Sequence, residues 1–132
     1  MELKGNFGSE LFIDVSTTDI DMINDKKHIM KWLRSLIDDI GMDIHRIDGK
    51  EAILVDTWTP PGMDFAAGTS VSILISSSSI TLHTAVDMRD KNLGVLYLNC
   101  FSCKDFQQKD VEDSIRKYWD GVTILKYLKI DR

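Results

Sequence analysis

Two kinds of hydrophobic pattern alternate along this chain, and together they predict its secondary structure. Short apolar or alternating runs bounded by turn residues predict seven strands. These strands cover Glu10–Val15, Asp43–Ile47, Ala52–Trp58, Thr69–Ile75, Ile80–Thr84, Gly94–Cys103 and Val122–Ile130. Apolar residues at three- and four-residue spacing predict two helices, one from Asn24 or Asp25 to Ile40 and one within Asp105–Trp119. An Asn or Asp can cap the first helix, and Gly41 can end it.

The order of these elements indicates the fold class. Most strands form one consecutive block, with a helix before it and a helix after it, which is typical of an α+β fold. We therefore predict an antiparallel sheet with two helices packed on one face. The length of 132 residues fits a single domain spanning residues 1–132. The sequence lacks both a strict βαβ alternation and a glycine fingerprint for a nucleotide phosphate.

Two turns are predicted from their residue types. Asp48-Gly49-Lys50 is a strong hairpin signal between the second and third predicted strands. His45, in the second of the seven predicted strands, is expected to be a surface or edge residue. The four serines at 76–79 interrupt two apolar runs and should form either a hairpin tip or a kink.

Composition and charge narrow the possible functions. Apolar residues make up 43% of the chain, which is enough to bury one core, and the net charge of −5 argues against sequence-independent nucleic-acid binding. An acidic chain is compatible with a cationic or zwitterionic small ligand. No run of 18 apolar residues predicts a membrane span. The N-terminal residues lack the features of a signal peptide, so we expect a cytoplasmic protein with reduced thiols.

Cys100 and Cys103 have the C-x-x-C spacing but lie on a predicted strand. Residues three apart on a strand point to opposite faces, so we expect neither a disulfide nor a shared zinc ion. No second such pair completes a metal site, and no metal is expected. One cysteine should lie in the core, and the other should face a site.

Ser70, the serine run, His83 and Cys103 follow one another in an order that suits self-processing. A serine after a strained peptide bond can attack the preceding carbonyl, and elimination from the resulting ester leaves a pyruvoyl group. These steps need a base and a hydrogen-bond donor. A pyruvoyl group forms a Schiff base with an amine and accepts the electrons of a departing carboxylate. A thiol can then return a proton.

The segments GTSVSILISSSSITLHT (68–84) and LNCFSC (98–103) resemble the bacterial and archaeal short-chain S-adenosylmethionine decarboxylases. That family carries a G-x-S strand start, then E-S-H, H-T-W-P-E and V-D-x-[FY]-T-C-G. The resemblance implies cleavage between Ser77 and Ser78, with the pyruvoyl cofactor made from Ser78. It also implies that Ser70 and His83 assist processing and that Cys103 is the catalytic proton donor.

Several family positions differ in this chain. Ser77, Ser79, Asn99 and Lys104 stand where the family has Glu, His, Asp and Gly, and Ala85-Val86-Asp87 replaces W-P-E. By resemblance, Asp87 takes the place of the acidic residue that binds the ribose hydroxyls. Phe65 is the nearest match to the aromatic residue that holds adenine. The processing residues are thus kept, while the substrate-binding residues have drifted.

Three functional hypotheses follow. The first is a pyruvoyl-dependent decarboxylase acting on S-adenosylmethionine for spermidine synthesis, or on another amino acid. The second is an uncleaved, inactive homologue that serves as a ligand-binding or regulatory subunit. The third is a small α+β domain whose matches are accidental. The resemblance further implies a homodimer or larger homo-oligomer with shared sites, and no nucleic-acid or membrane partner is expected.

Overall fold

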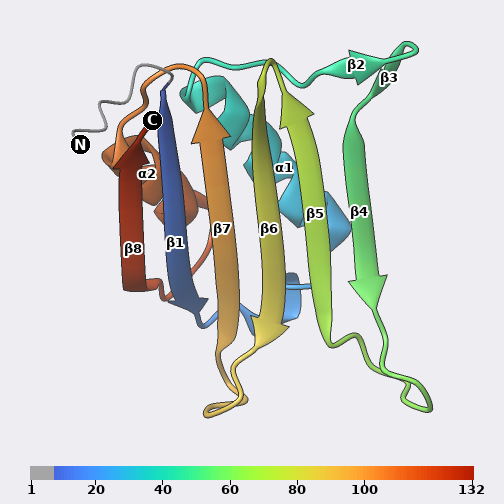
Figure 1. Cartoon of the computed structure of the whole chain (residues 1–132). Helices are drawn as coiled ribbons and strands as arrows, with labels where there is room; N and C mark the ends of the chain where they lie inside the picture. The colour runs from blue at the N-terminus through green and yellow to red at the C-terminus, as the bar shows by residue number, and fades with distance from the viewer. Residues whose placement is uncertain (1–7) are drawn as a thin grey trace, which may run out of the picture.

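The computed structural model describes residues 8–132 as an antiparallel sheet with two helices (Figure 1). The elements in chain order are β1 (Ser9–Thr17), the 3-10 helix η1 (Ile20–Met22), α1 (Lys26–Asp39), β2 (Arg46–Ile47), β3 (Lys50–Glu51), β4 (Ile53–Trp58), β5 (Gly68–Ile75), β6 (Ser78–Val86), β7 (Gly94–Ser102), α2 (Gln108–Tyr118) and β8 (Thr123–Asp131). The six-stranded sheet has the order β4-β5-β6-β7-β1-β8, and β2 and β3 form a separate ribbon. The predicted α+β class is confirmed.

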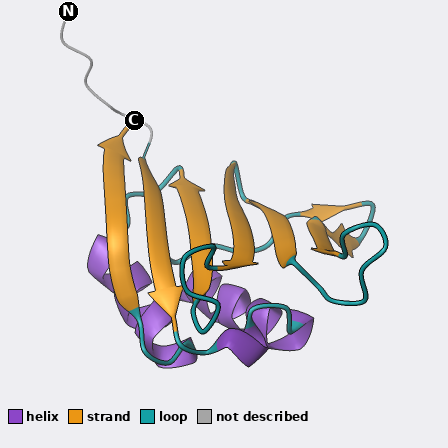
Figure 2. Ribbon diagram, turned by 90° about the horizontal axis from the view of Figure 1, so that it is seen from below, coloured by secondary structure: helices purple, strands orange, loops and turns teal. Residues whose placement is uncertain are grey.

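Both helices lie on the same face of the sheet, as predicted, and the opposite face carries no helix within residues 8–132 (Figure 2). Alternate residues of each inner strand point toward the helices, as the pleat requires. On β1 these are Leu11, Ile13 and Val15, all fully buried. They pack with α1 residues such as Trp32 and Leu33 in one hydrophobic core. Burial of this apolar surface is the main stabilising term of the fold.

The ends of α1 follow the predicted capping chemistry. The Asp25 side chain accepts the backbone N–H of His28 at 3.0 Å, which satisfies one free donor of the first turn. Gly41 has φ +73°, a left-handed conformation that glycine adopts without steric cost.

No helix of the described residues is long and apolar enough to cross a membrane.

Two predicted elements have different limits in the structure. The first hairpin turns through Asp48 and Gly49 alone, because Ile47 pairs directly with Lys50. Most of the predicted strand before that turn is not in β2. Its backbone runs past the end of β5 instead, where His45 donates its N–H to the Leu74 carbonyl at 2.8 Å and Ile44 bridges Ile75.

The second helix lies within the predicted range and begins at Gln108. Asp105 lies outside it, because its carboxylate accepts a hydrogen bond from Ser9 Oγ at 2.5 Å and an ion pair from Lys129 at 3.4 Å. Both partners are on neighbouring strands of the sheet. The contacts therefore hold the segment after β7 against β1 and β8 before the helix starts.

Candidate functional site

The serine run is the tip of the β5–β6 hairpin, which decides between the two predicted alternatives. Ile75 pairs with Ser78, so Ser76 and Ser77 form a two-residue turn. Ser77 has φ +59°, a left-handed conformation that is unfavourable for a residue with a Cβ. Such a conformation costs on the order of 1 kcal/mol or more. The backbone strain therefore lies in the residue immediately before the Ser77–Ser78 peptide bond.

Ser78 is the first residue of β6 and is 7% exposed. Its Oγ accepts the backbone N–H of Cys103 at 2.8 Å and donates to the Ser76 carbonyl at 3.4 Å. The Cys103 thiol donates to the same carbonyl at 3.4 Å. The hairpin tip and the segment after β7 thus bring together a strained peptide, a buried hydroxyl, a donor N–H and a thiol.

The two cysteines differ as the strand pattern predicted. Cys100 is buried in the core, and burial raises the pKa of its thiol to about 12. Cys103 is half-buried just past the end of β7. Both thiols are free. Cys103 is therefore the cysteine that the fold makes available near Ser78.

Ser70 and His83 form a second pair, on the helix-free face. They stand directly opposite each other on β5 and β6, and Ser70 Oγ lies 2.8 Å from His83 Nδ1. Both side chains are exposed. A hydroxyl hydrogen-bonded to an imidazole can relay a proton, but only to a group that approaches this face.

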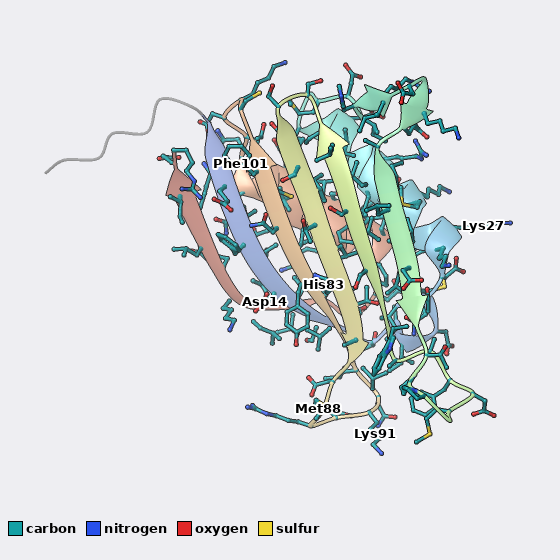
Figure 3. The ribbon with its side chains drawn as sticks, turned by 45° about the vertical axis from the view of Figure 1, so that its right-hand side comes forward. Asp14, Lys27, His83, Met88, Lys91 and Phe101 are labelled. Carbon is teal, nitrogen blue, oxygen red and sulfur yellow. The ribbon has the colours of Figure 1, made fainter. Side chains whose placement is uncertain are left out.

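Within one chain, the two pairs are far apart. His83 follows Ser78 by five residues on β6, which corresponds to roughly 16 Å at the usual strand rise. An odd separation also places the two side chains on opposite faces of the sheet. Figure 3 shows His83 in the lower half of the sheet, far from Phe101 near its upper end. Phe101 marks the hairpin tip in this view, because it pairs with Ser79. The four predicted catalytic residues therefore do not form one site in a single chain.

The two predicted substrate-binding residues lie at the lower end of the sheet, away from Ser78 (Figure 1). Phe65 is 54% exposed in the β4–β5 loop. Asp87 follows β6, and its Oδ1 accepts the backbone N–H of Arg89 at 2.7 Å and that of Asp90 at 3.3 Å. Asp87 thus stabilises its own turn, and neither residue reaches the hairpin tip of its own chain.

An open depression of about 490 Å³ lies at the hairpin tip. It is lined by His45, Leu74, Ile75, Ser77, Ser78, Ser79 and Phe101. Sequence reasoning placed His45 at the surface and attached no function to it. Its place beside the hairpin depends on the long-range pairing of Ile44 with Ile75, which no local pattern reveals.

A second depression of about 390 Å³ adjoins the first and shares Ser79 and Phe101 with it. Its other lining residues are Glu10, Asn99 and Arg132. Glu10 accepts hydrogen bonds from Arg132 Nε at 2.9 Å, from Arg132 Nη2 and from Asn99 Nδ2 at 3.3 Å. Asn99 is one of the positions that differ from the family, and no local sequence pattern singles out Glu10 or Arg132. In residues 8–132 no three His, Cys, Asp or Glu side chains gather into a metal site.

Comparison with known proteins gives one match that covers most of the chain. A family model described as S-adenosylmethionine decarboxylase matches residues 9–129. This range contains the hairpin tip, the Ser70–His83 pair and both cysteines. No curated protein matches the chain.

Proposed function

The chain belongs to the S-adenosylmethionine decarboxylase family, as its motifs predicted, and we propose that it is a pyruvoyl-dependent decarboxylase matured by self-cleavage between Ser77 and Ser78. One observation carries the proposal: the Ser78 hydroxyl accepts the Cys103 N–H directly beside the strained residue Ser77. Strain before the bond to be broken raises the energy of the ground state, and a nearby donor can stabilise an oxyanion.

Cleavage can be written with this chain's own atoms. Ser78 Oγ attacks the Ser77 carbonyl carbon, the amide nitrogen leaves, and an ester forms. A base then removes the Ser78 α-proton while the Cβ–Oγ bond breaks, so that Ser77 keeps a new carboxylate. Tautomerisation of the resulting enamine and hydrolysis by one water release ammonia and leave a pyruvoyl group at position 78. The family normally uses such a self-derived group.

The residues around position 78 fit this group and its chemistry. A pyruvoyl group supplies an electron sink for the electrons of a departing carboxylate. The depression beside the hairpin exposes the scissile peptide to a ligand while the rest of Ser78 stays buried. Cys103 places a thiol at the same turn, where it can return a proton to the product carbon.

The remaining catalytic pair reaches this turn only if a second chain supplies it. Ser70 and His83 face outward on a sheet surface that also carries Phe12, Leu54 and Leu74, which are between 41% and 76% exposed. Large apolar side chains on an uncovered face favour association. In the proposed homodimer the two helix-free faces pack together, so each His83 approaches the other chain's hairpin tip from its open side and acts on the Ser77–Ser78 peptide there. A larger homo-oligomer built from such dimers would also bring His83 of one chain to the hairpin tip of another.

The proposed substrate is S-adenosylmethionine. Its decarboxylated product would be used for spermidine synthesis in the cytoplasm. In the proposed dimer the two-fold axis runs across the strands and so reverses their direction, which puts the lower end of one chain near the hairpin tip of the other. This arrangement brings the exposed ring of Phe65 toward the partner's depression. Asp87 can join it through its second carboxylate oxygen, because both hydrogen bonds from its turn fall on Oδ1.

Intact-mass spectrometry of the purified protein tests the proposal, with Ser78→Ala as the variant and Ser79→Ala as the matched control. We expect fragments 1–77 and 78–132 from the unsubstituted protein and from the control, with a blocked, ketone-reactive N-terminus on the second fragment. Ser78→Ala should stay intact. A single uncut unsubstituted chain under all conditions would overturn the decarboxylase proposal.

The second hypothesis, that of an uncleaved binding homologue, is supported by the replaced motif residues. Ser77 and Ser79 stand in place of the family's Glu and His around the cleavage site, and Ala85-Val86-Asp87 replaces W-P-E. If the chain stays uncut, calorimetry with S-adenosylmethionine separates a ligand-binding homologue, which gives a saturable heat, from a domain without this ligand.

A further inference from the structure

We propose that Glu10 is a specificity-determining carboxylate that binds the second positive charge of a cationic amino-acid substrate. The proposal rests on the proposed function, because it takes the substrate amine to react at position 78. It names the class of substrate rather than the reaction. It also assigns a role to Arg132, which competes with the substrate for Glu10.

The register of the sheet sets Glu10 in line with the hairpin tip. Ser79 on β6 stands opposite Phe101 on β7, and Phe101 stands opposite Glu10 on β1. All three side chains lie on the helix-free face, because residues directly opposite each other on paired strands point to the same face of the sheet. The two depressions share Ser79 and Phe101, so they lie next to each other along a track from Ser78 to Glu10.

The dimensions of this track suit a small amino acid. Two strand spacings separate Ser79 from Glu10, which is roughly 10 Å between Cα atoms. The Glu10 side chain extends into this distance. The space left between its carboxylate and the hairpin tip is comparable to the length of an extended basic amino acid. The depressions of about 490 and about 390 Å³ are each within the range of small-ligand sites.

The hydrogen bonds of Glu10 leave room for a ligand. A carboxylate has about four acceptor positions. Two bonds from Arg132 fall on Oε2, and one from Asn99 falls on Oε1, so residues 8–132 leave about one acceptor position on Oε1. The Glu10 side chain is only 12% exposed, whereas that of Arg132 is 53% exposed. The carboxylate is thus sheltered, while the guanidinium lies closer to solvent.

Chemistry then selects the ligand class. A sheltered carboxylate with a remaining acceptor position attracts a cation and disfavours an apolar or anionic group, because burial strengthens the interaction between charges. The side-chain ammonium of a basic amino acid can donate a hydrogen bond to this position, whereas the sulfonium of S-adenosylmethionine has no N–H and meets the carboxylate through charge attraction alone. Both are therefore included as separate arms of the test.

Calorimetry on the Ser78→Ala protein, which cannot cleave itself, measures binding without the reaction. The ligands form two pairs that differ mainly in the second charge: S-adenosylmethionine with S-adenosylhomocysteine, and L-lysine with L-norleucine. We expect at least one cationic member to bind about tenfold more tightly than its neutral partner, the equivalent of one favourable charge contact. The pair that shows the difference identifies the source of the cation.

Two further substitutions in that protein separate recognition from a merely structural ion pair. Glu10→Gln should abolish the preference for the charged ligand, and Arg132→Gln should increase it by removing the competing cation. Glu51→Gln is the matched control, since Glu51 pairs with Arg34 at 2.6 Å on a distant surface. Equal binding within both ligand pairs, or changes of the same sign in the Glu10 and Arg132 variants, would overturn the proposal. Circular dichroism verifies that each variant is folded. If Glu10→Gln does not fold, the Arg132→Gln variant still provides a test, because Arg132 is exposed.

Turnover of the unsubstituted protein separates this proposal from the one on which it rests. If the chain cleaves and releases CO₂, the preferred substrate should carry the second charge, and Glu10→Gln should lose the preference while still cleaving. If the chain stays uncut, the decarboxylase proposal fails, and the binding comparison alone decides the role of Glu10.

Discussion

The two faces of the six-stranded sheet are made by the same strands, yet they have different chemistry. On the helix-covered face, Ile13, Ile73 and Ile80 are completely buried. On the other face, Phe12 and Leu74 remain 41% and 45% exposed although they are large and apolar. The covered face is completed within one chain. The open face keeps apolar surface unburied, which favours association.

Polar residues form the centre of the open face. Ser70, Ser72, Thr81 and His83 lie side by side on β5 and β6, between the apolar residues of the outer strands. The covered face instead holds the buried half of the hairpin tip, where Ser78 meets the segment after β7. The comparison teaches that folding of one chain places Ser78 but leaves His83 on the opposite face, so the proposed processing by His83 requires a second chain.

The largest expected effect concerns this need for two chains. His83→Ala and Ser78→Ala should each remain uncut alone, because every site lacks one residue. In a refolded equimolar mixture, roughly half of the His83→Ala chains should pair with a Ser78→Ala chain and be cleaved. Intact-mass spectrometry of the mixture measures this fraction. Cleavage of His83→Ala by itself would show that His83 is not required from either chain.

The buried Cys100 thiol is expected to react far more slowly than the thiol of Cys103. The pKa of about 12 leaves Cys100 with far less thiolate at pH 8 than an ordinary cysteine, and the core blocks access as well. Iodoacetamide followed by peptide mass spectrometry should label Cys103 first and Cys100 only after unfolding. Labelling of both at similar rates in the native protein would contradict the assignment of Cys100 to the covered face.

Neighbouring residues on β1 compare the two faces in stability. Ile13→Ala should lower the free energy of unfolding by about 2–5 kcal/mol, because it leaves a cavity in the core. Phe12→Ala should change it by only about 0.5 kcal/mol in the monomer, since its side chain is already partly in water. Urea unfolding at a dilution where the protein is monomeric gives both values. Phe12→Ala should also weaken self-association in sedimentation equilibrium, and equal stability losses would refute the distinction.

The smallest expected effect is on thermal stability; it is electrostatic and depends on pH. The hydrogen bond from Ser9 and then the charge of Lys129 hold the pKa of Asp105 below its usual range. A carboxyl with a lowered folded pKa stabilises the protein above the unfolded value of about 3.9, and this contribution disappears as the pH falls through the folded pKa. Asp105→Asn should therefore lower Tm at pH 7 and not in strong acid.

Scanning calorimetry at both pH values measures this difference, with the exposed Asp56→Asn on β4 as the control. A deficit in Tm that is the same at pH 7 and in acid would show that packing, rather than charge, accounts for the effect of Asp105. The contact also holds the segment that carries Cys103, so the same variant should slow self-cleavage modestly.

The sequence by itself determined the elements and their faces. Periodicities of two and of about three and a half residues reflect local backbone geometry, so they predicted β1, α1 and the antiparallel sheet. The same parity rule separated Cys100 from Cys103. Applied to Ser78 and His83, five residues apart, it would also have placed them on opposite faces, whereas the motif grouped them together.

Only the tertiary structure decided which distant segments meet. The contact of Ile44 with Ile75 put His45 beside the hairpin tip, and the pairing of β1 with β7 and β8 assembled Glu10, Asn99 and Arg132. These contacts join residues separated by as many as 122 positions. No local pattern specifies such a pair, because its energy depends on how the whole sheet closes over its core.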